Sequence, residues 1–510
     1  MLRKTSCHFK EAARNREFSR KAPSGVYMNS RFEASAKNPY KQEETMQSAD
    51  NLMQEKLFTP ELLDLRSFAL NLNRLVHYGY HSDTGIIEKY ASRAIELAST
   101  MKSRDYAMTL NSFAKAGYTN SDNLIATYCK TMTPRLIHFI PLEIGLVLNA
   151  LTKLGKDHPS VPAFLKSLVD EIPHKLDSFE PDNLAQTVHA LARLGYTRDK
   201  LLISDITTHF IKHSDKYDSQ SLFMVMNAFG RFVRSVPVEP EFWDAAMRRA
   251  ILVDLEPHMP ALMLTAVAAA KHSSPVVLEF SSEMARQSNN LPMTMSALAK
   301  LGMFGSRLPW KNMIEEISRS ENLHSRDALQ VLHAIARRGV GDATDLAIRI
   351  IGNLEICSLN ELSLVAYAQA RLEVTAPDLL EKATRLLSDE KAISTVTLAT
   401  IAYSFKKIAD SSLMYYYIFK GFEGASDVSV ESMCMAMAGF AERGAIAVKL
   451  REVFEKIIKK KQLTASEANR LLVAKVEWSK DVNELLSEVG SEEVVRYSVH
   501  RDKILEGLEV

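Results

Sequence analysis

Polar and basic side chains recur at a fixed spacing along this 510-residue chain. Typically an Asn or a His is followed four residues later by a Lys or an Arg, as in Asn111 and Lys115. Residues four apart lie on one face of a helix. There, Lys and Arg can contact phosphates, while Asn and His can hydrogen-bond to sugars or bases. The stripe defined by this spacing consists of Asn111, Lys115, Asn149, Lys153, His189, Arg193, Asn227, Arg231, Lys300, His333 and Arg337.

The same residues have a simpler interpretation, in which they form the solvated face of an amphipathic helix or hydrogen-bond to adjacent repeats. The charge balance weighs against strong binding of nucleic acid. Residues 1–40 contain nine Lys or Arg and three Glu, which is +6, so the remaining 470 residues sum to −5. A body of this charge lacks the basic footprint expected of a free-standing nucleic-acid binder. RNA and protein partners therefore both remain open, and the second alternative is a pure protein scaffold.

The stripe lies within a nine-residue motif that returns many times. It reads LNSFAKAGY at 110–118, LNALTKLGK at 148–156 and VHALARLGY at 188–196, with weaker copies elsewhere from residue 72 onward. Successive copies begin 31 to 40 residues apart. A period of this size indicates one supersecondary unit stacked many times, so that neighbouring units bury each other's apolar faces.

Each unit is predicted to be a helical hairpin. In 180–217, Pro181 suits the first turn of a helix, Gly195 its end, and Thr197 the cap of a second helix. Gly117, Gly195 and Gly302 are expected to end first helices with a positive φ. The predicted fold is therefore all-α, a right-handed α-solenoid of about eleven or twelve hairpins. The predicted domains are a leader and linker at 1–50, repeats at 59–290 and 291–480, and a helical cap or tail at 481–510.

Signatures of catalysis and of bound cofactors are not found in the sequence. It contains no Walker motif, no GxGxxG, no GxSxG, no HExxH and no EF-hand loop. His209 and His213 are four apart but have no nearby third ligand, so we expect neither a metal nor a cofactor there. The cysteines Cys7, Cys129, Cys357 and Cys434 form no CxxC pair. We expect a protein that is not an enzyme, has no small-molecule substrate and does not bind a membrane.

The N-terminus resembles an organellar presequence. The opening MLRKTSCHFKEAARNREFSRK has basic residues, Ser and Ala, with no acidic residue before Glu11. This composition predicts import into the mitochondrial matrix. The alternative is a disordered basic tail, which Glu11 and Glu17 favour.

The motif LxxALAKLG, with its period of about 35–40 residues, resembles helical-repeat proteins of organellar RNA metabolism. These are the octotricopeptide and heptatricopeptide types and the repeats that precede the RAP domain. The ending EEVVRYSVHRDKILEGLEV does not resemble a RAP domain, which favours an adaptor.

The leader and divergent repeats also resemble HEAT/ARM-like subunits of the kinetoplastid RNA editing substrate-binding complex. The resemblance implies mitochondrial RNA (guide RNA or mRNA) and protein subunits of a ribonucleoprotein complex as partners. A mitoribosome subunit or assembly factor is the competing interpretation.

Overall fold

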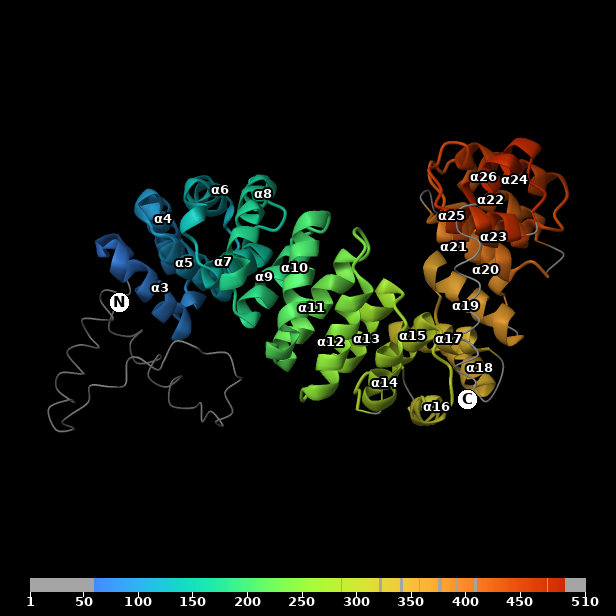
Figure 1. Ribbon diagram of the computed structural model, residues 1–510, viewed down its shortest axis with the longest axis horizontal. Helices are drawn as coiled ribbons and strands as arrows, with labels where there is room; N and C mark the ends of the chain where they lie inside the picture. Colours follow the sequence, from blue (N-terminus) through green and yellow to red (C-terminus); the bar gives the residue numbers. More distant parts are fainter. Residues whose placement is uncertain are drawn as a thin grey trace. The chain divides into compact units, whose positions relative to one another are not determined.

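The computed structural model describes residues 59–285, 287–320, 323–339, 343–356, 358–374, 378–389, 393–407, 411–474 and 476–490. All regular structure in these ranges is helical, and they contain 24 α-helices and no strand (Figure 1). The chain divides into two compact units, Met1–Arg93 and Ala94–Val510. The predicted leader at 1–50 and residues 491–510 of the predicted tail lie outside the described residues.

The described part of the first unit is short. It contains the 3-10 helices η2 (Pro60–Leu62) and η3 (Tyr80–Ser82), α3 (Leu65–His77) and the greater part of α4 (Thr84–Leu97). Asp64 caps α3, because its carboxylate accepts a hydrogen bond of 2.8 Å from the amide of Ser67. Phe68 and Tyr90 are buried with ring centroids 5.4 Å apart, which joins α3 to α4.

The second unit is a stack of eleven helical hairpins, as the repeat period predicts. The first helices are α5 (Ser103–Ala116), α7 (Pro141–Leu154), α9 (Pro181–Arg193), α11 (Ser219–Phe232), α13 (Met259–Ala270), α15 (Leu291–Leu301), α17 (Ser325–Arg338), α19 (Leu359–Leu372), α21 (Thr395–Ser404), α23 (Val430–Phe440) and α25 (Ala465–Val473). Each packs on the first helix of the next hairpin, from α5 on α7 to α23 on α25. These helices form one continuous layer.

The second helices form the other layer. They are α6 (Asp122–Met132), α8 (Val161–Glu171), α10 (Lys200–His213), α12 (Pro240–Leu252), α14 (Pro275–Met284), α16 (Trp310–Arg319), α18 (Thr344–Asn353), α20 (Leu379–Asp389), α22 (Ser412–Glu423), α24 (Ala445–Ile458) and α26 (Lys480–Gly490). The 3-10 helices η4 (Ala98–Thr100), η5 (Thr133–His138), η6 (Pro173–Ser178) and η7 (Ser214–Lys216) connect early hairpins. The chain is therefore an all-α helical-repeat solenoid.

The repeated motif places its apolar positions in the core between the layers. Its first residue is fully buried in successive helices, as Leu110, Leu148 and Val188 show. These positions recur at helical spacing, so one side of each first helix faces the core. The other side carries the motif's second and sixth residues and stays open.

Three glycines end first helices as predicted. Gly117, Gly195 and Gly302 have φ of 67°, 80° and 72°, in the left-handed region that glycine adopts without strain. Capping boxes begin α19 and α25, where Ser358 pairs with Glu361 and Thr464 pairs with Glu467.

The predicted cap of α10 is wrong. Thr197 does not cap this helix; instead, the carboxylate of Asp199 accepts a hydrogen bond of 3.1 Å from the amide of Leu202. The Thr197 hydroxyl lies 3.3 Å from that of Ser235 in the next hairpin. Asp is at least as good an N-cap as Thr, and it stands directly before the first helical residue.

Candidate nucleic-acid interface

The stripe residues lie on the open face of the first-helix layer. The Asn and His residues are all half-buried in the middle of their helices, among them Asn111, His189 and His333. The basic residues stand in the last turn or the last residues of α5, α7, α9, α11, α15 and α17. All of these basic residues are exposed except Arg193, which is half-buried. Each polar residue therefore lies one turn before a cation.

Stripe residues on neighbouring helices are close enough for their charges to shift one another's pKa values. Although Lys300 is exposed, partial desolvation by the surrounding protein lowers its pKa, and the charges of Arg337 on α17 and Arg234 lower it further. In the same way, burial followed by the charges of Arg193 and Arg231 lowers the pKa of His189. Such effects require charges that are close and poorly screened. The structure thus brings the stripe together across α9 and α11 and again across α15 and α17.

The six cations of the stripe have no partner among the described residues. The side chains of Lys115, Lys153, Arg193, Arg231, Lys300 and Arg337 form no hydrogen bond and no ion pair within that part of the chain. Arginines on the other layer behave differently. Arg249 donates a 2.8 Å hydrogen bond to the carbonyl of Tyr217, and Arg349 a 2.7 Å hydrogen bond to that of Ser318. Those arginines hold the hairpins together, whereas the stripe cations do not.

Acidic residues at the opposite ends of the same helices are used for capping. The carboxylate of Glu143 accepts a 3.1 Å hydrogen bond from the amide of Ile140, and that of Asp105 a 3.0 Å hydrogen bond from Lys102. These acids satisfy amides that have no partner within the helix. In α5 and α7, therefore, an acid at the start of the helix is committed to the fold, and a cation without a partner stands at the end.

The helix dipole offers a competing explanation for the cations. A cation in the last turn of a helix gains about 0.3–1 kcal/mol from the dipole. That effect does not depend on which side of the helix the cation occupies. All six stripe cations nevertheless share the side that carries the Asn and His residues, so the dipole alone does not account for their alignment.

The stripe has a gap at α13. The corresponding residues there are Thr265 and Ala269. Arg234, which follows α11 and is exposed, supplies a charge close to Lys300 on α15. Arg234 is the last residue of its motif copy, outside the polar–basic spacing, so only its place in the fold identifies it as a functional candidate.

The stripe ends after α17. Arg371 on α19 occupies the equivalent position, but its Nε lies 3.5 Å from the carbonyl of Ala336 and donates to it. Lys406, just beyond α21, lies over the ring of Tyr403 at 4.2 Å from its centroid. Both side chains already have partners, which sets them apart from the six stripe cations.

The stability of the solenoid is expected to depend on the protonation of His333. Burial, with the charges of Arg337 and Lys300, lowers the pKa of His333 to about 4. An unfolded His has a pKa of about 6.5. Between these values the unfolded chain binds more protons, so stability is lost as the pH falls. We expect Tm to decrease from pH 7 to pH 4.5 and His333→Asn to reduce that decrease. Equal decreases in both proteins, measured by circular dichroism melts, would exclude His333 as the responsible group.

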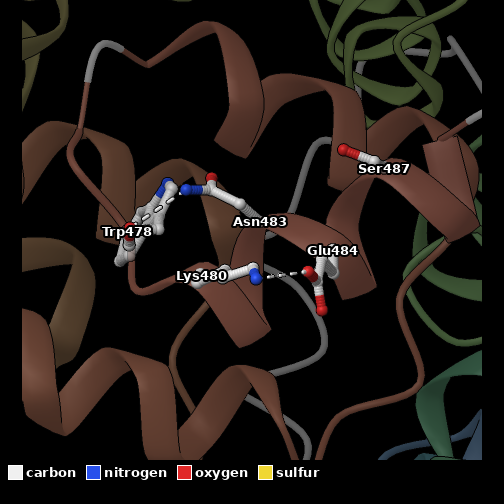
Figure 2. Close-up of a pocket in the computed structure, with 5 residues that line it drawn as sticks. All are labelled: Trp478, Lys480, Asn483, Glu484 and Ser487. Atoms are coloured by element: carbon white, nitrogen blue, oxygen red, sulfur yellow. Dashed lines mark hydrogen bonds and ion pairs between the residues drawn. The ribbon is translucent and has the colours of Figure 1, made fainter.

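A second candidate site lies at the last hairpin. An open depression is lined by Trp478, Lys480, Asn483, Glu484 and Ser487 (Figure 2). Its polar groups are largely engaged: Asn483 donates a 3.0 Å hydrogen bond to the carbonyl of Trp478, and the charged ends of Lys480 and Glu484 are 3.8 Å apart.

Metal sites and membrane spans are not found within the described ranges. His209 and His213 have ring centroids 4.7 Å apart, but no group of three or more His, Cys, Asp or Glu gathers anywhere in these ranges. Cys129 is buried, which raises the pKa of its thiol to about 12, and Cys434 is half-buried; Cys7 and Cys357 lie outside the described residues. None of the described helices is both long and apolar enough to span a membrane.

Comparison with known proteins finds similarity to solved structures only. No protein-family model matches the chain. No curated protein matches it either. Among solved structures, a homology-built AP-3 complex in an intermediate open conformation is similar at 10% identity, covering 90% of this chain and 82% of that one, with a TM-score of 0.33. The pentatricopeptide repeat protein PPR10 in complex with an 18-nucleotide psaJ RNA element is similar at 12% identity, with 88% of each chain covered and a TM-score of 0.24. The fold itself defines this chain as a helical-repeat protein.

Proposed function

We propose that this chain is a non-catalytic RNA-binding subunit of a mitochondrial ribonucleoprotein complex. The observation that carries the RNA-binding part is the row of six cations without partners on the open face of the first-helix layer. Aligned cations of this kind neutralise successive phosphates and release their counterions. In this proposal the chain contributes a binding surface to the complex and takes no part in catalysis.

Single-stranded RNA fits this surface best. The half-buried Asn and His residues lie one turn away from the cations, so a strand whose phosphates follow the cations would turn its sugars or bases toward the polar row. Unpaired bases expose edges that such side chains can hydrogen-bond, whereas the bases of an RNA duplex are largely hidden from them.

A protein scaffold is the second candidate function. The solvent-facing side chains Ile137, Ile140 and Leu142, around the start of α7, are 65%, 54% and 39% exposed. Several exposed apolar side chains within six residues favour contact with another protein. This surface is compatible with RNA binding elsewhere on the chain, as expected for a subunit of a complex that binds both.

The mitochondrial part of the proposal rests on the basic composition of residues 1–40 and on the resemblance of the repeats. The same resemblance motivates a role in RNA editing or processing, with guide RNA or mRNA bound. The test is to express the full chain with a C-terminal tag, fractionate the cells, and irradiate the purified mitochondria with ultraviolet light. Recovery of crosslinked mitochondrial RNA is expected. Cytosolic retention would refute the location, and recovery of protein partners without RNA would favour the scaffold.

A further inference from the structure

Two first helices of the layer carry the same three side chains on their open faces. In α9 these are Gln186, His189 and Arg193, and in α17 they are Gln330, His333 and Arg337. The surrounding sequences, QTVHALAR and QVLHAIAR, also match closely. Spacings of three and four residues place each set on one face. We call these two sets the Gln–His–Arg triads.

Neighbouring first helices have different residues at these positions. The Gln position holds Leu146 in α7 and Met108 in α5, and the His position holds Asn in both helices. An apolar residue followed by Asn is thus an alternative that this fold accommodates. The Gln and His of the triads are therefore not required by the packing of a first helix.

The Gln and His side chains of both triads are half-buried. Gln186, His189, Gln330 and His333 form no side-chain hydrogen bond within the part of the chain that the structure describes. The Oε1 atom of Gln330 is buried without any partner there. Leaving a buried carboxamide oxygen unsatisfied has a free-energy cost, which a ligand donor would remove.

The chemistry of the triads suits a nucleobase. Burial and neighbouring cations lower the pKa values of both histidines, so at neutral pH each imidazole is uncharged. A neutral imidazole has one donor and one acceptor, and a carboxamide presents an acceptor oxygen beside a donor NH2 group. The Tyr367 ring of α19 lies 5.8 Å from that of His333 and adds aromatic surface beside the second triad. Base edges present paired donors and acceptors, and base faces stack on aromatic rings.

We propose that each Gln–His–Arg triad is a base-reading subsite, in which Gln and His hydrogen-bond the edge of one unpaired base while Arg contacts a neighbouring phosphate. This inference rests on the proposed RNA-binding function and adds sequence preference to it. The first helices α5, α7 and α11 carry an apolar residue in place of the Gln and Asn in place of the His. They contact the strand but discriminate less between bases than the triads do. The two preferred nucleotides are separated by a constant distance, because α9 and α17 are fixed in one stack.

The test is selection from a pool of random single-stranded RNA with the full-length purified protein. The wild type is expected to enrich two preferred nucleotides at a constant separation. The double variant Gln186→Leu with His189→Asn gives α9 the residues of α7 at these positions and should abolish one preference. Gln330→Leu with His333→Asn should abolish the other. Loss of a good base contact is expected to reduce discrimination roughly 10-fold at that position, because binding of the preferred base weakens toward that of the others.

A reverse exchange provides a second measurement. Leu146→Gln with Asn149→His builds the triad pattern on α7, ahead of Lys153, and should create a third preferred position. Circular dichroism melts check that each variant is folded, and the two triads test the inference independently if one variant unfolds. Tight wild-type binding without positional preference, or preferences that survive both double variants, would overturn the subsites and leave the proposed function standing. Failure of the wild type to bind any RNA would instead refute the proposed function itself.

Discussion

Replacing Lys153, Arg193 and Arg231 with alanine is expected to weaken the binding of single-stranded RNA roughly 50-fold at 0.15 M salt. Each phosphate of a single strand that is neutralised contributes about −0.7 to the slope of log K against log salt. Three lost contacts should therefore flatten that slope by about 2 units, if each side chain meets one phosphate. The loss should be similar for all RNA sequences, because phosphate contacts carry no sequence information. The measurement is fluorescence anisotropy over a salt series.

The matched control removes the same charge from the other layer. Lys130, Lys166 and Lys212 are exposed on α6, α8 and α10. Their replacement with alanine should leave the slope nearly unchanged. Both triple variants should keep the wild-type Tm within a few degrees, because the stripe cations have no partner in the described chain. Equal affinity and slope for the folded stripe variant and the wild type would eliminate the stripe as the RNA-binding surface and favour the scaffold.

The second large effect is expected at the contact between α21 and α23. Gly439 of α23 packs so closely on α21 that an added Cβ would lie 2.5 Å from the carbonyl carbon of Ala402 and 2.6 Å from its oxygen. Main-chain atoms cannot rotate away as side chains do, so the two helices would have to separate. Forcing extra atoms into a packed core typically costs 1–3 kcal/mol. We expect Gly439→Ala to lower the free energy of unfolding by about 2 kcal/mol, despite the better helix propensity of Ala.

Gly352 is the matched control for this change. It lies in α18, and a Cβ added there would meet no atom within 4 Å. Only the helix propensity changes at this position, so Gly352→Ala should raise the free energy of unfolding by about 0.5–1 kcal/mol. Urea titrations of both variants measure the two effects. A Gly439→Ala protein as stable as the wild type would show that α21 and α23 are not in the close contact described.

The architecture could be predicted from the sequence because its signals are local and repeated. Buried residues such as Leu148, left-handed glycines such as Gly195 and the capping box at Ser358 each follow from residue type and spacing within a few positions. The N-cap of α10 was missed because Thr197 and Asp199 are both acceptable caps, and the choice depends on where the helix begins.

The candidate site could be predicted only in part. The motif predicted which helix face carries Lys153 or Arg231, because residue spacing within a single helix determines that face. It could not indicate that Arg234 lies close to Lys300, since that proximity depends on how α11, α13 and α15 stack. Nor could it indicate that Arg371 is engaged by the carbonyl of Ala336. Contacts between hairpins require the packed structure.

The most direct test of the RNA-binding surface is to locate where RNA touches the chain. Purified full-length protein is irradiated with single-stranded RNA, digested, and the peptides that carry a nucleotide are identified by mass spectrometry. Attached nucleotides are expected on peptides from the open faces of α9, α11 and α17, around His189, Asn227 and His333. Attachment confined to peptides of the second helices, such as α8 and α10, would contradict the account.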